Sequence, residues 1–197
     1  MNKLFAALVG VAFSIPAASS AATLNFTEVV GGYQGGNTVT LSNATVTTAG
    51  PDIYVARPNY YSPSVGPNGG FCGLTSMNGY NCSVDTNITF NEAIDNLSFL
   101  ATAFGTGDSA TASIFSGSTL LASIAIVANG VVDFSGYTGV TRLFLDDTGS
   151  TAAGVVYGAF NFDGEDVSPV PLPASLPLML AALGGAGFVA RRKKKAA

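Results

Sequence analysis

Short apolar runs broken by Gly, Asn and Pro fill the chain from Thr23 to Phe162. In the run from Val84 to Phe90, Val84, Thr86, Ile88 and Phe90 fall on alternate positions, which is typical of a β-strand with one buried face. No convincing amphipathic helix interrupts this pattern. The predicted strands are Leu24–Thr27, Val39–Leu41, Val84–Phe90, Ile94–Phe104, Ala110–Phe115, Leu120–Val127, Val131–Phe134, Thr141–Leu145 and Val155–Phe162.

Two glycine-containing pairs predict tight turns between neighbouring strands. Ser116-Gly117 or Gly117-Ser118 can reverse the chain into Leu120–Val127, and Asn129-Gly130 suits a type I′ hairpin into Val131–Phe134. Eight or nine short strands at this spacing indicate an all-β fold, an antiparallel β-sandwich or barrel. A jelly roll is our first choice among these.

The N-terminus has the three parts of a secretory signal peptide. A single cation, Lys3, precedes the apolar run Leu4–Ile15, and the small-residue stretch Ala17–Ala22 follows Pro16. The apolar run is too short to span a bilayer comfortably. We therefore expect residues 1–22 to be removed after Ala22, which leaves residues 23–166 as the exported domain.

The C-terminal residues 167–197 show a different pattern. No charged residue occurs from Val167 to Ala190, and the 19 residues Leu172–Ala190 would span about 28 Å as a helix, close to the thickness of a bilayer core. The cluster Arg191-Arg192-Lys193-Lys194-Lys195 follows at once. By the positive-inside bias this cluster stays in the cytoplasm, so we expect a transmembrane helix at about 172–190 with the β-rich domain outside the cell.

The motif Val170-Pro171-Leu172-Pro173-Ala174, together with this apolar run and basic tail, resembles the VPLPA variant of PEP-CTERM sorting signals. The prolines keep the chain out of a helix where the span begins, which is the extended form that a protease-like site can grip. The resemblance implies processing by an exosortase, a membrane enzyme. It also implies that the protein is anchored in the inner membrane before processing and lies at the cell surface or in an extracellular polysaccharide matrix afterwards.

A second resemblance concerns the β-rich region itself. The stretch Asn81–Phe162, above all the run Asp133-Phe134-Ser135-Gly136-Tyr137, is similar to ectodomains that commonly carry PEP-CTERM signals. That similarity implies a galactose-binding-like or lectin-like jelly roll. It does not carry a ligand with it.

Charge is divided sharply between the ends and the middle of the chain. From Thr23 to Asp166 the chain holds two cations, Arg57 and Arg142, against all twelve acidic residues, a net charge of −10. Such a domain repels phosphate backbones, which excludes nucleic acid as a partner.

The cysteine and histidine counts limit the chemistry. The two cysteines, Cys72 and Cys82, predict a disulfide in an exported chain. The chain has no histidine, and every lysine lies in an end segment, so Ser-His-Asp, Cys-His, Schiff-base and Ser-Lys mechanisms are excluded. Paired carboxylates remain, but strand alternation would send Asp146 and Asp147 to opposite faces. We expect no enzymatic activity, no catalytic residue and no cofactor.

Two binding features stay open at this point. Asp108, Asp146, Asp147 and the cluster 163–166 are oxygen ligands suited to calcium, or simply solvated turn carboxylates. The loop Arg57–Pro63 offers Tyr60 and Tyr61 for stacking on sugar rings, or for local packing.

The resemblance therefore implies a non-enzymatic, exported protein with a structural or adhesive role linked to extracellular polysaccharide. The alternative is a lectin-like module that binds a carbohydrate, with or without calcium.

Overall fold

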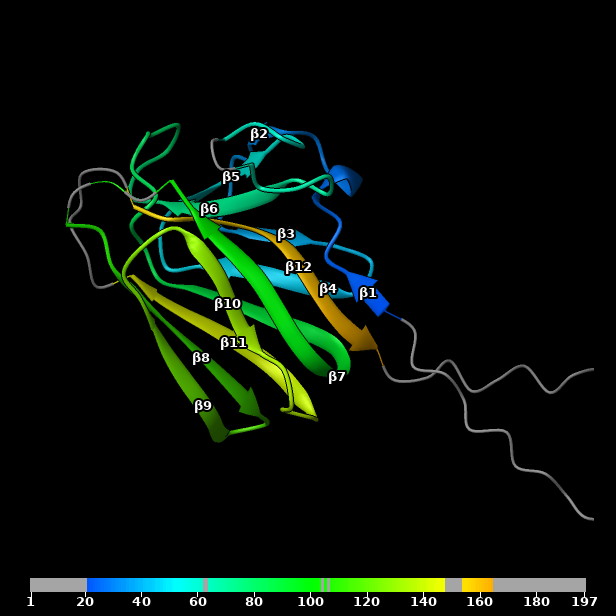
Figure 1. The fold of residues 1–197 in the computed structure, drawn as a ribbon. Coiled ribbons are helices and arrows are strands. Elements are labelled where there is room, and N and C mark those ends of the chain that lie inside the picture. The colour runs from blue at the N-terminus through cyan, green and yellow to red at the C-terminus, as the bar shows by residue number, and fades with distance from the viewer. Residues whose placement is uncertain (1–20, 62–63, 104, 106, 148–153, 165–197) are drawn as a thin grey trace, which may run out of the picture. The chain divides into compact units, whose positions relative to one another are not determined.

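In the residues that the structure describes, antiparallel β-strands form nearly all of the regular structure, which confirms the predicted all-β class (Figure 1). The computed structural model of the 197-residue chain describes residues 21–61, 64–103, 105, 107–147 and 154–164. One 3-10 helix, η1 (Phe26–Glu28), accompanies the strands in these residues. The strands are β1 (Ala21–Thr23), β2 (Gly32–Tyr33), β3 (Thr38–Thr40), β4 (Ala44–Thr48), β5 (Asp52–Ala56), β6 (Gly70–Leu74), β7 (Thr86–Thr102), β8 (Ala110–Ser116), β9 (Thr119–Ile126), β10 (Gly130–Phe134), β11 (Val140–Asp147) and β12 (Val156–Gly164).

The 17-residue strand β7 organises the sheet. Its first part, Thr86–Phe90, pairs with β4 on one side, and Thr86–Thr89 pair with β11 on the other. Its last part, Leu97–Thr102, lies between β10 and β12. The strand order through the first part is β3-β4-β7-β11-β8-β9, and through the last part it is β2-β5-β6-β12-β7-β10. β1 pairs with the far end of β12.

A turn from a distant part of the chain fixes the middle of β7. Asn96 has φ 54°, a left-handed conformation that asparagine tolerates better than most residues. Its Oδ1 accepts the backbone N–H of Gly136 at 2.8 Å, and its own N–H donates to the carbonyl of Tyr137 at 2.9 Å. The Asp95 carboxylate accepts the N–H of Gly139 at 2.7 Å. The change of partners along β7 therefore occurs where the Asp133–Gly139 turn binds it.

Both parts of β7 contribute to one apolar core. Ile88 from the first part and Phe99 from the last part belong to the same buried cluster. Phe99 stacks on Phe160 at a ring distance of 5.2 Å, and Phe26 lies 5.2 Å from Phe71. These rings supply much of the buried apolar area that stabilises the fold.

Several predicted strands need correction. Val84–Phe90 and Ile94–Phe104 lie largely in a single strand, β7. The prediction of a strand at Leu24–Thr27 is wrong, because the Asn25 side chain accepts the N–H of Thr27 and caps η1 instead.

One predicted hairpin is confirmed and the other is wrong. Gly117, with φ 57°, connects β8 and β9, which pair with each other. Asn129-Gly130 does not join a hairpin: β10 pairs with β7, and the described residues contain no ladder between β9 and β10. Pairing with β7 buries Val132 and Phe134 of β10 in the core.

The predicted ends of the chain lie outside the described residues. These are most of the signal peptide, the Val170–Ala174 motif, the helix at 172–190 and the basic tail Arg191–Lys195. No helix within the described part of the chain is long and apolar enough to cross a membrane.

Candidate functional site

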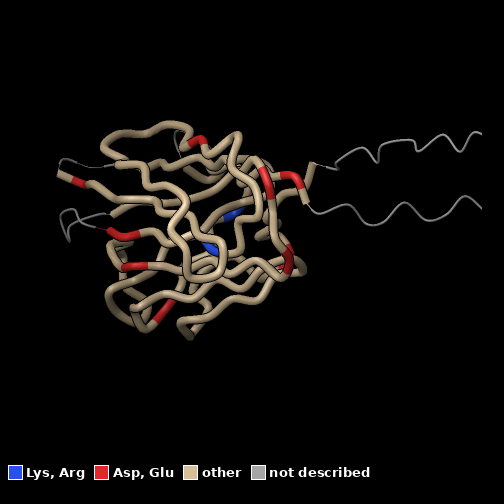
Figure 2. The backbone as a smooth tube through the Cα atoms, turned by 90° about the horizontal axis from the view of Figure 1, so that it is seen from below, with Lys and Arg blue, Asp and Glu red and all other residues tan. Residues whose placement is uncertain are grey.

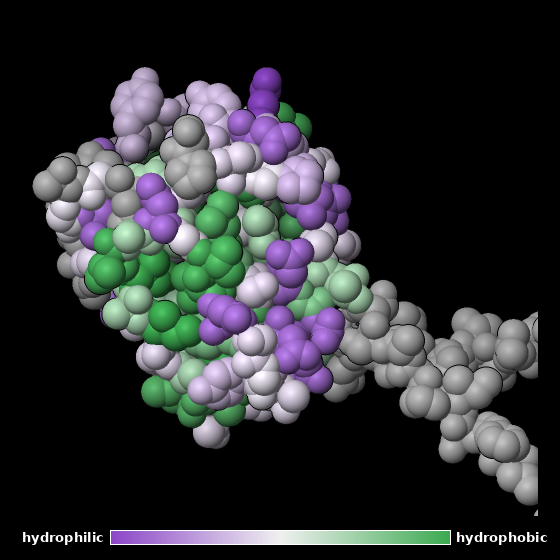
Figure 3. Space-filling view, in the orientation of Figure 1, coloured by the Kyte–Doolittle hydropathy of each residue, from purple (hydrophilic) through white to green (hydrophobic). Residues whose placement is uncertain are grey.

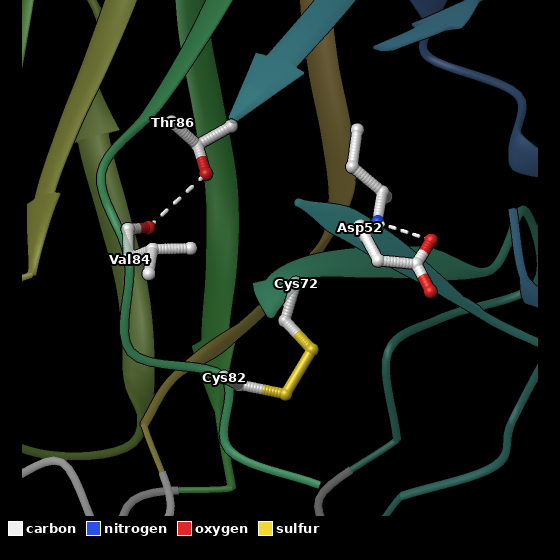
Figure 4. Close-up of a disulfide and its surroundings, with 6 residues drawn as sticks. Asp52, Cys72, Cys82, Val84 and Thr86 are labelled. Atoms are coloured by element: carbon white, nitrogen blue, oxygen red, sulfur yellow. Dashed lines mark hydrogen bonds between the residues drawn. A yellow bond between two sulfur atoms is a disulfide. The ribbon is translucent and has the colours of Figure 1, made fainter. Parts of the chain in front are cut away.

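The predicted disulfide is present and ties the middle of a buried strand to the following loop (Figure 4). Cys72 lies in β6 and Cys82 ten residues later, with their Cα atoms 5.2 Å apart. Inside the loop, Thr75 donates to the carbonyl of Asn81 at 3.2 Å. The carbonyl of Cys82 accepts the N–H of Val155 at 3.1 Å, which joins the loop to the start of β12. The loop is therefore fixed at both ends.

Asp52 of β5 holds the same loop from the other side. Its side chain is fully buried, and its Oδ1 accepts the N–H groups of Gly35 at 2.9 Å, Gly36 at 3.3 Å and Ile53 at 2.9 Å. Its Oδ2 accepts the N–H of Asn78 at 3.3 Å. A buried carboxylate is tolerated only with such compensation. Asp52 thus joins the segment after β2 to the disulfide loop.

Between these segments lies a cleft lined mostly by tyrosines. Five of the seven tyrosines in the chain surround a hollow of about 270 Å³. The lining is completed by the disulfide loop. The residues are Tyr33, Tyr54, Tyr60, Tyr61, Leu74, Gly79, Tyr80 and Cys82.

The tyrosine rings pack in pairs and still face solvent. Tyr33 lies edge-on to Tyr54 at a ring distance of 5.3 Å, and Tyr60 lies edge-on to Tyr61 at 5.1 Å. Tyr60 is 61% exposed and Tyr80 is 89% exposed, whereas Tyr54 and Tyr61 are half-buried. The half-buried rings support a rim of exposed rings, which offers both flat apolar faces and hydroxyl groups to a ligand.

The environment raises the pKa of three of the hydroxyls. Burial is the main cause that raises the pKa of Tyr54 and Tyr61, and neighbouring tyrosines raise it further. Partial desolvation also raises the pKa of Tyr33, helped by Tyr80 and by the Asp52 carboxylate. Arg57 acts against the increase at Tyr54. A phenol with the usual pKa near 10 is already neutral at pH 7, so these three hydroxyls both donate and accept hydrogen bonds there, and the raised pKa values extend this into more alkaline solution.

The predicted sugar-contact loop contributes only part of this cleft. Tyr60 and Tyr61 line it, and they also pack on each other, so both interpretations of the loop describe part of the structure. Tyr33, Tyr54 and Tyr80 were not predicted, because they come from three other segments. The signal that could have drawn attention to them is the concentration of tyrosine between residues 33 and 80.

The predicted calcium ligands are dispersed. Asp108 accepts the N–H of Gly105, and the Asp163 carboxylate accepts the side-chain amide of Asn96 at 2.8 Å. Asp147 donates its backbone N–H to the Asp85 carboxylate at 3.2 Å. In the part of the chain that the structure describes, no group of three or more His, Cys, Asp or Glu residues could hold a metal ion.

A hollow of about 300 Å³ near the start of β1 is a weaker candidate. Its lining combines small and amide side chains with Glu92 and Ile94, and Phe162 is the single aromatic residue among the described residues that line it. The tyrosine cleft offers more stacking surface in a similar volume.

Comparison with known proteins identifies only the C-terminal segment. No curated protein matches the chain. Residues 169–194 match the family described as the PEP-CTERM protein-sorting motif, and this range includes Val170–Ala174 and the basic residues Arg191–Lys194. The chain therefore carries a PEP-CTERM protein-sorting motif, which implies export and processing by an exosortase.

Proposed function

We propose that this protein is a non-enzymatic adhesive component of the cell surface or extracellular matrix, and that its tyrosine cleft binds extracellular polysaccharide. The sorting motif supports delivery to that place, first as a membrane-anchored form held by a helix at 172–190. The observation that supports polysaccharide as the ligand is that five tyrosines line one hollow.

The chemistry of the cleft matches that of a sugar. A pyranose ring presents an apolar face of C–H groups and an edge of hydroxyls, so it stacks on aromatic rings and exchanges hydrogen bonds with neutral phenols. The hollow of about 270 Å³ lies just below the usual range for ligand pockets, about 300–1,000 Å³. It suits one ring or the end of a glycan rather than the length of a chain.

The lining also supports binding without catalysis. Hydrolysis of a glycosidic bond needs two carboxyl groups that flank the bond. None of the described residues that line the cleft is acidic. The nearest buried carboxylate, Asp52, accepts four backbone N–H groups and so acts as a structural residue.

A jelly-roll-like sandwich is the finer description of the fold that we propose. The two sets of strands on either part of β7 share one buried cluster, as expected when a sheet folds over and its halves face each other. In this arrangement the cleft lies at the β2-β5-β6 edge, where loops are free to form a binding site.

Glycan-array binding by the full-length protein, purified in detergent, tests the function. We expect selective, saturable binding that Tyr60→Ala and Tyr80→Ala each weaken about tenfold, the loss of about 1.4 kcal/mol expected for an aromatic contact. Tyr137→Ala is the matched control, because Tyr137 is 40% exposed and does not line the cleft. Equal losses from all three variants, or no selective binding, would argue against the proposal. A chelator distinguishes the calcium-dependent lectin, since the tyrosine cleft should bind equally well with and without it.

A further inference from the structure

β9 is an edge strand with one side of its backbone unpaired. In the described residues it pairs only with β8, and the neighbouring β10 pairs only with β7. A register shift lies near the hairpin end, between Ile114 and Phe115. Beyond it, Ala122–Ile126 pair with Ala110–Ile114 in unbroken register and form a regular edge. Such an edge presents N–H and C=O groups that another strand can bind.

The usual protections of an edge strand are missing here. Natural edges carry lysine, proline or inward-facing charge, which prevents pairing with another chain. The 24 residues from Ser109 to Val132 contain no charged residue and no proline. They include β8, β9 and the start of β10.

Apolar side chains beside this edge are incompletely covered. Leu121, Ala122 and Ile124 pack on the core but remain partly exposed. Val127 is 76% exposed and Val131 is 70% exposed, and a hollow of about 410 Å³ lies between the end of β9 and β10. Figure 3 shows hydrophobic residues gathered over the region where Figure 1 places β7, β9 and β10. A further strand along β9 would cover this surface.

We propose that a second copy of this chain binds there, with the two β9 strands paired antiparallel across a twofold axis. An antiparallel pair of identical strands is self-complementary, so one surface serves both partners. Charge limits where a second copy can bind. Figure 2 shows acidic residues spread over the described fold, which holds only two cations, so two copies repel each other across most of their surfaces. β9 carries no charged residue, and Asp133 of β10 is the acidic residue in the lining of the adjoining hollow, so the repulsion is weakest along β9 itself.

Sedimentation of the full-length protein in detergent tests the pairing. Ala125 is exposed in β9 and makes no side-chain hydrogen bond, so Ala125→Lys and Ala125→Glu add charge to the edge without removing such a contact. Thr40→Lys is the matched control at an exposed position of β3, a strand that pairs only with β4 in the described residues. We expect a concentration-dependent dimer for the wild type and for Thr40→Lys. Both Ala125 variants should raise the dimer dissociation constant at least tenfold.

Salt and hydrogen exchange complete the test. The wild-type dimer should strengthen as salt screens the acidic surfaces, and the β9 amides should exchange more slowly as protein concentration rises. A dimer that persists unchanged in both Ala125 variants would place the contact elsewhere and overturn the proposal. A wild-type protein that stays monomeric at millimolar concentration and high salt would also overturn the proposal. This holds even if β9 is then found to bind a different protein.

Discussion

The carboxylate of Asp52 accepts the backbone N–H of Asn78 at 3.3 Å, from within the loop that the Cys72–Cys82 disulfide closes. The same carboxylate accepts the N–H groups of Gly35 and Gly36, which follow β2. One buried side chain therefore positions two walls of the tyrosine cleft, the one that carries Tyr33 and the one that carries Tyr80.

Asp52→Ala should destabilise the domain and loosen the cleft. It leaves buried N–H groups without their acceptor, which costs about 1–3 kcal/mol for each group that water cannot reach. Urea unfolding followed by tyrosine fluorescence measures the effect. Asp133→Ala is the control, because the Asp133 carboxylate accepts the N–H of Ser135 in an exposed turn. A loss no larger than that of the control would show that Asp52 is dispensable.

Removal of the disulfide should weaken both the fold and the cleft. A Cys72→Ala/Cys82→Ala variant should lose about 2–3 kcal/mol of unfolding free energy, on the chain-entropy estimate for a loop of this length. Because Gly79, Tyr80 and Cys82 line the cleft, glycan affinity should fall as well. Titration of the wild type with glycan before and after reduction checks the second effect. Unchanged affinity after full reduction would mean that the loop holds its place without the covalent bond.

The sequence predicted strands whose hydrophobicity alternates or forms an apolar run, and missed strands that show neither signal. β8 shows a clear period of two and β12 begins with an apolar run, and both strands were predicted. β6 is buried at all five positions and is built from Gly70-Phe71-Cys72-Gly73-Leu74, so it has neither alternation nor strong β-propensity. β4 alternates in burial, but its residues Ala44–Thr48 are too small and polar to show a hydrophobic signal.

The partners of each strand were harder to predict than its existence. Asn129-Gly130 is a strong local hairpin signal, yet β10 pairs with β7, because that position buries Val132 and Phe134. The cleft was missed for a related reason. Its tyrosines lie on segments from residue 33 to residue 80, and only the tertiary structure brings them together.

Asn96 supplies a further test of the bend in β7. Asn96→Ala removes the side-chain bonds to Gly136 and Asp163 and also strains the backbone at φ 54°. Asn96→Gly loses the same bonds without the strain. We therefore expect both variants to be less stable than the wild type, with alanine worse than glycine by about 1 kcal/mol. Equal stability of the two variants would mean that the left-handed conformation is not retained after substitution.

Tyr157 predicts an alkaline limit on stability. Its ring is buried in the core, and burial, helped by the nearby carboxylates of Asp147, Asp85 and Asp146, raises its pKa well above the usual value near 10. The phenol thus stays protonated in the folded state at a pH where the unfolded chain ionises. Stability is fully present below about pH 10 and falls as pH rises above that value.

Tyr157→Phe should remove this part of the alkaline dependence. The Tyr157 hydroxyl has no hydrogen-bond partner among the described residues, so its removal should leave stability at pH 7 unchanged or higher by up to about 1 kcal/mol. Urea unfolding at pH 7 and at pH 10.5 for both proteins checks the two statements. A marked loss of stability at pH 7 would show that the hydroxyl makes a bond that stabilises the fold.

β1 bears on where the signal peptide is cut. Ala21 pairs with Asp163 and Ala22 with Phe162, and Ala22 packs against the core, so two of the three residues of β1 precede the expected cut after Ala22. A cut after Ser20 also satisfies the small-residue rule, with Ala18 and Ser20 at the required positions, and leaves β1 whole. Because β1 covers part of β12, we expect the exported protein to begin at Ala21.

We also expect a chain that begins at Thr23 to be less stable by about 1–2 kcal/mol. Intact mass of the exported protein gives the first residue, and urea unfolding of the two forms gives the difference. A native N-terminus at Thr23 with no loss of stability would show that the fold does not need β1.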